Sequence, residues 1–143
     1  MAININTLDT ERKTVAEGLH LAEICSVKKR TNKNDPDKEH LNICFKTTTG
    51  TFFDTISESE ENLAQYKLSQ LLKATGALET LTGEVELDDI QRAITGKTVG
   101  VFVIIKEQDN GYGPRAEIDI NTDMYLTPEE YEEYQAAAQD DTV

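Results

Sequence analysis

Apolar and polar residues alternate along the first part of the chain. The alternation spans residues 19–27 and 41–46, and a shorter apolar run follows a turn at residues 51–56. Because side chains of a β-strand point alternately to the two faces of a sheet, these segments predict three strands. The polar segment 31–40 contains Asn-Asp-Pro-Asp, which fits neither a helix nor a central strand, so it predicts a loop. We therefore expect an antiparallel meander. In its first strand, Ala22 and Ile24 would lie on one face, and the other face would carry Leu19, Leu21, Cys25 and Val27.

Helical spacing replaces this alternation after the third strand. Residues 57–76 begin with Ser and Glu, carry leucines at helical intervals, and end at Gly76, a residue suited to a helix C-cap. A second short helix is predicted at residues 87–94. The most β-rich run of the chain follows at about 98–106. A hairpin loop rich in Gly then leads into a fifth strand, "RAEIDIN", at 115–121.

The resulting order is three strands, a helical insertion and two strands. This mainly β layout is that of a five-stranded OB-fold barrel, which binds oligonucleotides on one sheet face and through its first and fourth loops. Another small α+β sheet would have the same order of elements. We assign residues 1–126 to this domain, with residues 1–16 as an N-terminal arm. Residues 127–143 are predicted to form an acidic C-terminal helix and flexible tail, since "TPEE" is a typical helix start.

Charge is distributed unevenly along the chain. The formal net charge is −13, yet residues 116–143 contain nine of the 27 acids and no Lys or Arg. Residues 1–115 therefore carry all 14 bases against 18 acids. Six bases lie within or beside the first loop: Lys28, Lys29, Arg30, Lys33, Lys38 and Lys46. The sequence thus combines a nearly balanced body, one basic region and a strongly acidic tail.

The basic region lies where an OB barrel has its first binding loop. Lys and Arg side chains there would neutralise phosphates, and Asn32 and Asn34 would donate hydrogen bonds to backbone or bases. A hairpin loop rich in Lys and Asn is also an ordinary solvated surface, and the loop alone does not separate the two interpretations. The candidate phosphate-binding residues are Lys28, Lys29, Arg30, Lys33, Lys46, Lys106 and Arg115.

Exposed aromatic rings would distinguish a surface for single strands, because each base stacked on a ring contributes about 1–3 kcal/mol. Phe52 and Phe53 are adjacent in a strand, so their side chains point to opposite faces. One belongs to the core, and the other is either covered by a helix or displayed to a ligand. Tyr112 lies between two glycines at the hairpin tip, and we expect it to stack on bases beside Arg115 and Lys106.

Motifs of enzymes and of cofactor sites do not occur in the sequence. It contains no nucleophile elbow, phosphate-cradling glycine loop, HExxH or CxxC. Cys25 and Cys44 lie in apolar stretches, which predicts buried, reduced thiols, and together with His20 and His40 they make a poor zinc set. We expect no enzymatic activity, no cofactor and no metal. Neither a membrane-spanning run nor a secretory signal is found, so we expect a cytoplasmic protein without a membrane partner.

The acidic tail is the second candidate functional segment. A segment of like charges is either a solvated end or an interaction tail. As an interaction tail it would occupy the basic groove in the absence of nucleic acid, and once displaced it would bind replication or recombination proteins. The candidate partner-binding residues are Glu129, Glu130, Glu132, Glu133, Asp140, Asp141 and Val143.

Three segments together resemble a known family. In this order, "VKKRTNKNDPDKEHLNICFKTTTGTFFDTI", "YKLSQLLKATG" and "VELDDIQRAITGKTVGVFVIIKEQDNGYGPRAEIDIN" are similar to the small phage-encoded single-stranded-DNA-binding proteins of OB fold. The resemblance covers roughly residues 15–126. It implies an OB fold, sequence-tolerant binding of single-stranded DNA (ssDNA) in phage replication or recombination, and often an acidic C-terminal tail.

By position, the resemblance assigns loop and hairpin residues to the binding surface. The matching residues are Thr31, Asn32, Lys33, Asn34, Tyr112 and Arg115. The chain departs from the family in having Asp-Pro-Asp where Gly-x-Pro is usual, and in lacking an Asn-Arg pair in its ending.

The sequence therefore predicts a non-enzymatic protein that protects ssDNA by charge neutralisation and base stacking. The alternative is an acidic protein-interaction module, either a DNA mimic or a replisome adaptor, that does not bind ssDNA. Mimicry requires a face lined with carboxylates on the folded body, whereas residues 1–115 are only weakly acidic. The sequence leaves a homodimer open.

Overall fold

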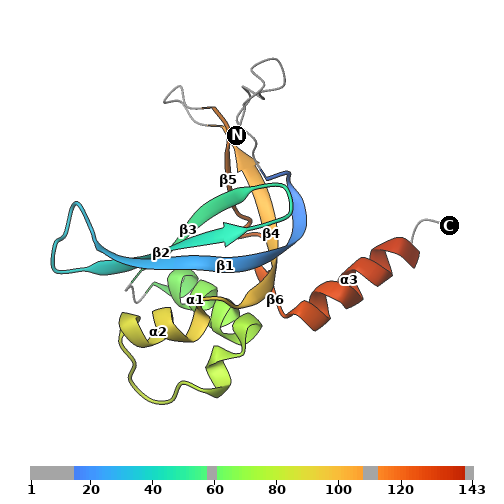
Figure 1. The fold of residues 1–143 in the computed structure, drawn as a ribbon. Helices are drawn as coiled ribbons and strands as arrows, with labels where there is room; N and C mark the ends of the chain where they lie inside the picture. The colour runs from blue at the N-terminus through green and yellow to red at the C-terminus, as the bar shows by residue number, and fades with distance from the viewer. Residues whose placement is uncertain (1–14, 58–60, 108–112, 141–143) are drawn as a thin grey trace, which may run out of the picture.

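The computed structural model describes residues 15–57, 61–107 and 113–140. Within them, Figure 1 shows a strongly bent sheet with helices beneath it and one helix projecting from its side. In chain order the elements are β1 (Gly18–Thr31), β2 (Glu39–Lys46), β3 (Thr51–Ser57), α1 (Asn62–Thr75), the 3-10 turn η2 (Ala77–Glu79), α2 (Leu87–Ile94), β4 (Thr98–Lys106), β5 (Arg115–Ile118), β6 (Tyr125–Leu126) and α3 (Pro128–Asp140).

The described strands form one antiparallel sheet in the order β3-β2-β1-β4-β5, and β6 pairs with β4. The predicted meander, helical insertion and returning strands are therefore confirmed as a mixed antiparallel sheet and helix arrangement. In the described part of the chain no ladder joins β3 to β5, so strand pairing leaves the sheet open between these two edges.

The predicted fifth strand is split in two. β5 ends at Ile118, because Asp119 forms a turn in which its side chain accepts a hydrogen bond from the Asn121 amide at 3.0 Å. The Asp119 carbonyl also accepts the Thr122 hydroxyl at 2.7 Å. Asx turns of this kind compete with the strand ladder. The chain re-enters the sheet as β6, opposite Gly100 and Val101 of β4.

A β-bulge changes the phase of β1. The pairing with β2 shifts between Ile24 and Ser26, so Cys25 is an additional residue. Before the bulge Ala22 and Ile24 point into the core, and after it Val27 does, whereas Cys25 is exposed. The expectation that Val27 shares a face with Cys25, and that Cys25 is buried, is thus wrong.

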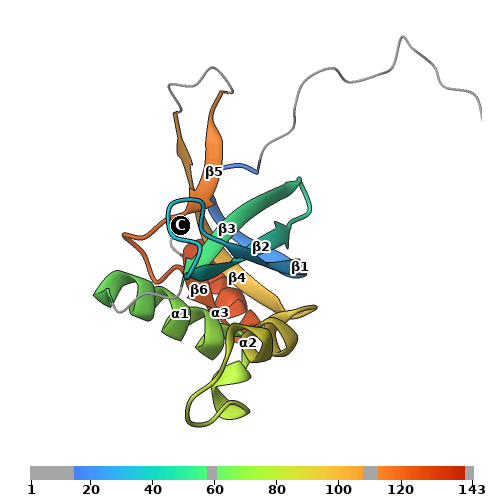
Figure 2. The ribbon, with the colours of Figure 1, turned by 90° about the vertical axis from the view of Figure 1, so that its left-hand side faces the viewer.

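One hydrophobic core lies between the sheet and helices α1 and α2, which Figure 2 shows beneath the strands. At its centre, the Phe45 ring of β2 stacks on Phe52 of β3, with centroids 5.1 Å apart, and on Tyr125 of β6 at 5.9 Å. Leu71 of α1 and Ile90 of α2 pack into the same cluster. The burial of these apolar side chains is the main stabilising contribution to the fold.

A polar cluster connects β3 to β6 and α1 on the open side of the sheet. The Tyr125 hydroxyl donates to Asp54 Oδ2 at 3.0 Å, and Lys67 Nζ lies 2.6 Å from the same oxygen. Lys67 also donates to the Thr55 carbonyl at 3.2 Å. Burial and the Asp54 charge raise the pKa of the Tyr125 hydroxyl well above its usual value. The cluster thus holds together elements that no β-ladder joins.

Helix α3 begins with the expected capping box. The Glu130 amide donates to Thr127 Oγ1 at 3.1 Å, and the Thr127 amide donates to Glu130 Oε1 at 3.0 Å. The helix is anchored through Tyr131, whose Cβ lies only 3.2 Å from where a Cβ on Gly100 would be. Figure 1 shows α3 on the side of the molecule opposite the β1–β2 loop.

Candidate nucleic-acid interface

The side of β1–β3 that points away from α1 and α2 is hereafter the outer face. Cross-strand pairing aligns its side chains in rows, one row being Lys28 of β1, Asn42 of β2 and Thr55 of β3. The intervening positions of β2, Leu41, Ile43 and Phe45, are buried in the core. The neighbouring rows of the outer face are Arg30–His40–Ser57, Ser26–Cys44–Phe53 and Glu23–Lys46–Thr51.

Phe53 is the aromatic ring that the outer face displays. Its side chain is 49% exposed, whereas Phe52 is 4% exposed and stacked on Phe45. The choice that the sequence left open is thereby resolved: Phe52 belongs to the core and cannot stack on a base without unfolding it. Phe53 is the cross-strand partner of Cys44. Its row lies between the row that contains Lys28 and the row that contains Lys46.

The predicted cations fall into three groups. Lys28, Arg30, Lys33 and Lys46 are exposed, and none forms an ion pair with any residue in the described segments. Successive outward positions on a strand are about 7 Å apart, so Lys28 and Arg30 present two charges along β1. Glu23 is the register partner of Lys46 and the nearest acid to it along the row, whereas Lys28 and Arg30 lie opposite Asn42 and His40.

Lys29 belongs to the second group. Its register partner is the core residue Leu41, so it points to the opposite side of β1 from Lys28. Its ammonium lies 3.0 Å from Asp88 of α2 and 3.7 Å from Glu39. The hydrogen bond and charge of Asp88 raise the pKa of Lys29. Lys29 is therefore separated from the outer-face cations with which the sequence grouped it.

The β1–β2 loop is organised by its own hydrogen bonds. The Asn32 amide donates to the Lys38 carbonyl at 2.9 Å, and the Lys38 amide donates to the Asp35 carbonyl at 3.0 Å. The side-chain oxygen of Asn32 accepts a hydrogen bond from His40 Nδ1 at 2.6 Å. Asn32 is half-buried and Asn34 is exposed. His40 was not among the sequence candidates, since only the strand register reveals that it lies opposite Arg30.

The cations of the β4–β5 hairpin form a separate group. Lys106 and Arg115 are cross-strand partners, and both approach Glu117, at 3.4 Å and 3.9 Å. Figures 1 and 2 show the ends of β4 and β5 apart from the β1–β2 loop. Tyr112 lies outside the described residues. The structure thus does not bring the hairpin cations together with those of the outer face.

The predicted tail residues lie on α3 or beyond it. Glu129, Glu132 and Glu133 are exposed, whereas Glu130 is half-buried and occupied in the capping box. The Asp140 side chain, Asp141 and Val143 lie outside the described part. α3, which is docked on β4 beside Gly100, lies on the far side of the molecule from the β1–β2 loop in Figure 1.

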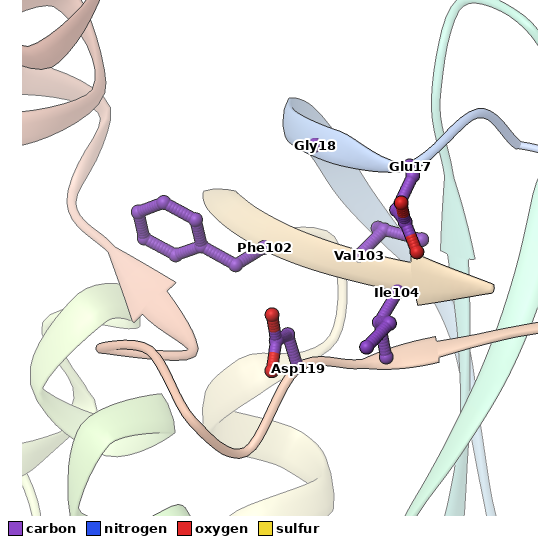
Figure 3. A pocket seen from close by; sticks show the side chains of 6 residues that line it. All are labelled: Glu17, Gly18, Phe102, Val103, Ile104 and Asp119. Atoms are coloured by element: carbon purple, nitrogen blue, oxygen red, sulfur yellow. The ribbon is translucent and has the colours of Figure 1, made fainter. Parts of the chain in front are cut away.

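A hollow of about 340 Å³ lies where the start of β1 meets β4, and it is lined by Glu17, Gly18, Phe102, Val103, Ile104 and Asp119. Glu17 accepts a hydrogen bond from the Ile105 amide at 3.0 Å, and Asp119 accepts one within its turn. Figure 3 shows the Phe102 ring and the Glu17 carboxylate pointing in different directions. Both carboxylates thus accept hydrogen bonds from backbone amides, and the residues that line the hollow do not form a set of acid, base and nucleophile.

Other chemistry is also sparse in the described part of the chain. No group of three or more His, Cys, Asp or Glu side chains there could hold a metal ion. None of the described helices combines the length and apolar character needed to cross a membrane. Compared with models of known protein families and with curated protein sequences, the chain matches none of them.

Proposed function

We propose that this chain is a non-enzymatic ssDNA-binding protein of the OB type, which holds a single strand across the outer face of β1–β3. The strand order β3-β2-β1-β4-β5, with α1 between β3 and β4, supports this proposal because it is the order of a five-stranded OB barrel. OB barrels are partly open, and the unpaired edges of β3 and β5 agree with that description.

The observation that carries the proposal is the exposed Phe53 ring among cations that form no ion pair within the described segments. Lys28 and Lys46 flank its row, and Arg30 extends the charge toward the β1–β2 loop. Ring stacking tolerates any base because every base has a π-face, and cations beside the ring bind the phosphates between bases. A surface built from one ring and several cations therefore favours a single strand, read without sequence preference.

The number of exposed cations on this surface determines how strongly the DNA affinity should depend on salt. If Lys28, Arg30, Lys33 and Lys46 each neutralise one phosphate, the slope of log affinity against log salt is about −3, at roughly −0.7 per contact. The chain as a whole is acidic, with a formal net charge of −13. Its long-range field therefore opposes association, and we expect binding that is measurable mainly at low salt.

Replacement of Phe53 tests this proposal. Phe53→Ala should weaken binding of fluorescein-labelled oligo-dT about 5- to 150-fold in anisotropy titrations, which corresponds to about 1–3 kcal/mol for one stacked base. Tyr66→Ala is a matched control, because Tyr66 is also 49% exposed but lies on α1. Equal effects of the two substitutions, or no binding of wild-type protein at low salt, would overturn the proposal.

A second proposal concerns α3, which projects from the body and exposes Glu129, Glu132 and Glu133. We infer that it docks basic surfaces of replication or recombination proteins, and the resemblance to phage proteins supports that setting. Deletion of residues 127–143 separates the alternatives. Loss of a protein-binding activity without any ssDNA affinity would favour the acidic interaction module, whereas retained or increased ssDNA affinity supports the primary proposal.

A further inference from the structure

The two cysteines of the chain face each other across β1 and β2. The bulge places both Cys25 and Ser26 opposite Cys44, because the register passes from Ile24↔Phe45 to Ser26↔Cys44. The Cys25 thiol donates to the Cys44 carbonyl at 3.4 Å, and both cysteines are free. This juxtaposition is not part of the proposed DNA contacts, and it has a chemistry of its own.

The strand spacing suits a covalent link between these residues. Cys44 is paired directly with Ser26, and the bulge sets Cys25 against the same residue, since two residues of the bulged strand oppose one of the partner. Disulfides join residues whose Cα atoms are about 4.4–6.8 Å apart, a range typical of neighbouring strands. Cys44 lies between the core residues Ile43 and Phe45 and so points to the outer face, and the exposed Cys25 has its sulfur within 3.4 Å of the Cys44 carbonyl. Neither strand would need to move far for the two sulfurs to meet.

The two thiols differ in reactivity. Cys25 is exposed and accessible to a reagent, whereas Cys44 is 8% exposed. Burial raises the pKa of the Cys44 thiol to about 11, and the neighbouring Cys25 contributes to this rise. Cys25 is therefore the thiol that attacks first, and Cys44 is the thiol that reacts from within the protein.

We propose that Cys25 and Cys44 form a dithiol redox site, which low-molecular-weight disulfides oxidise to a cross-strand disulfide. In the first step, the Cys25 thiolate attacks one sulfur of the small disulfide, forming a mixed disulfide and releasing one thiolate. In the second step, Cys44 gives its proton to solvent and attacks the Cys25 sulfur, releasing the second thiolate. Two protein thiols are oxidised, and one small disulfide is reduced to two thiols.

The site would link β1 to β2 within the row that ends at Phe53. This goes beyond the proposed DNA binding, because oxidation requires no nucleic acid and is measured without it. Failure of the redox site would leave the DNA-binding proposal unaffected, and failure of DNA binding would leave the dithiol intact.

Mass spectrometry of the folded, full-length chain tests the proposal. The protein is incubated at low concentration with oxidised glutathione, quenched with iodoacetamide and weighed intact. The expected product has lost the mass of two hydrogen atoms, carries no alkyl group, and yields a peptide pair joined through Cys25 and Cys44. A persistent glutathione adduct, two alkylated cysteines or a disulfide-linked dimer would overturn it.

Two variants identify the roles of the thiols. Cys44→Ser should stop the reaction at the glutathione adduct on Cys25, and Cys25→Ser should prevent reaction at neutral pH. The ring-closing rate should rise about tenfold per pH unit below the pKa of Cys44, since only its thiolate attacks. A closing rate that does not change between pH 7 and pH 9 would contradict the assignment of Cys44 as the second nucleophile.

Discussion

Lys28 and Lys29 are adjacent in the sequence but should differ in their contribution to DNA binding. Lys28 lies on the outer face opposite Asn42 and makes no ion pair within the described segments. Lys29 lies opposite the buried Leu41 and is paired with Asp88. Substitution of each by Ala thus compares two identical charges that the fold directs to opposite sides of one strand.

The expected loss of affinity for Lys28→Ala follows from counterion release. One phosphate contact contributes about 0.7 to the slope of log affinity against log salt for a single strand. At 0.1 M salt this amounts to about 0.7 log units, or roughly a fivefold change in the dissociation constant and about 1 kcal/mol. Lys28→Ala should therefore weaken oligo-dT binding about fivefold at this salt and make the slope shallower by about 0.7.

Lys29→Ala should leave both quantities nearly unchanged. Asp88 already neutralises the Lys29 ammonium at 3.0 Å, and a phosphate would have to compete with it from the far side of β1. The assay is fluorescence anisotropy of labelled oligo-dT at four or five salt concentrations, with circular dichroism to verify folding. Equal slopes for the two variants, or a larger loss for Lys29→Ala, would refute the assignment of faces.

Two further predictions concern Cys25 and Tyr125. Oligo-dT at ten times its dissociation constant should slow alkylation of Cys25 by iodoacetamide about tenfold, because DNA bound to the outer face covers this thiol. An unchanged alkylation rate would mean that the DNA binds elsewhere. Because the pKa of Tyr125 is raised in the folded state, its contribution to stability is complete below about pH 10 and is lost as the pH rises further. In urea unfolding the fall in stability above pH 10 should be steeper in the wild-type protein than in Tyr125→Phe, by up to about 1.4 kcal/mol per pH unit, and identical pH profiles would contradict the buried hydroxyl.

The elements of this fold could be predicted from local pattern, since alternation and helical spacing each report one face of an element. The splitting of the last strand could not, because it depends on the turn that Asp119 forms after Ile118. The capping-box pattern in the sequence predicts the start of α3. The packing of α3 against β4 could not be predicted, because it depends on Gly100, which is far from α3 in the sequence.

The candidate site was only partly predictable for a related reason. The sequence shows that Phe52 and Phe53 point to opposite faces, but not which face is covered, because that depends on where α1 packs. It also treats Lys28 and Lys29 as equivalent. The bulge at Cys25 shifts the phase of β1 and thereby decides which lysine points outward. Hydrophobic alternation alone cannot locate such an additional residue.

Photo-crosslinking tests the location of the bound DNA most directly. Oligo-dT bound to the full chain at low salt is irradiated, and mass spectrometry with fragmentation assigns the modified residues. The account predicts nucleotide adducts on Phe53 and its neighbours on the outer face of β1–β3. Adducts confined to Tyr66 on α1 or to α3, with none on the outer face, would contradict the central claim that this face holds single-stranded DNA.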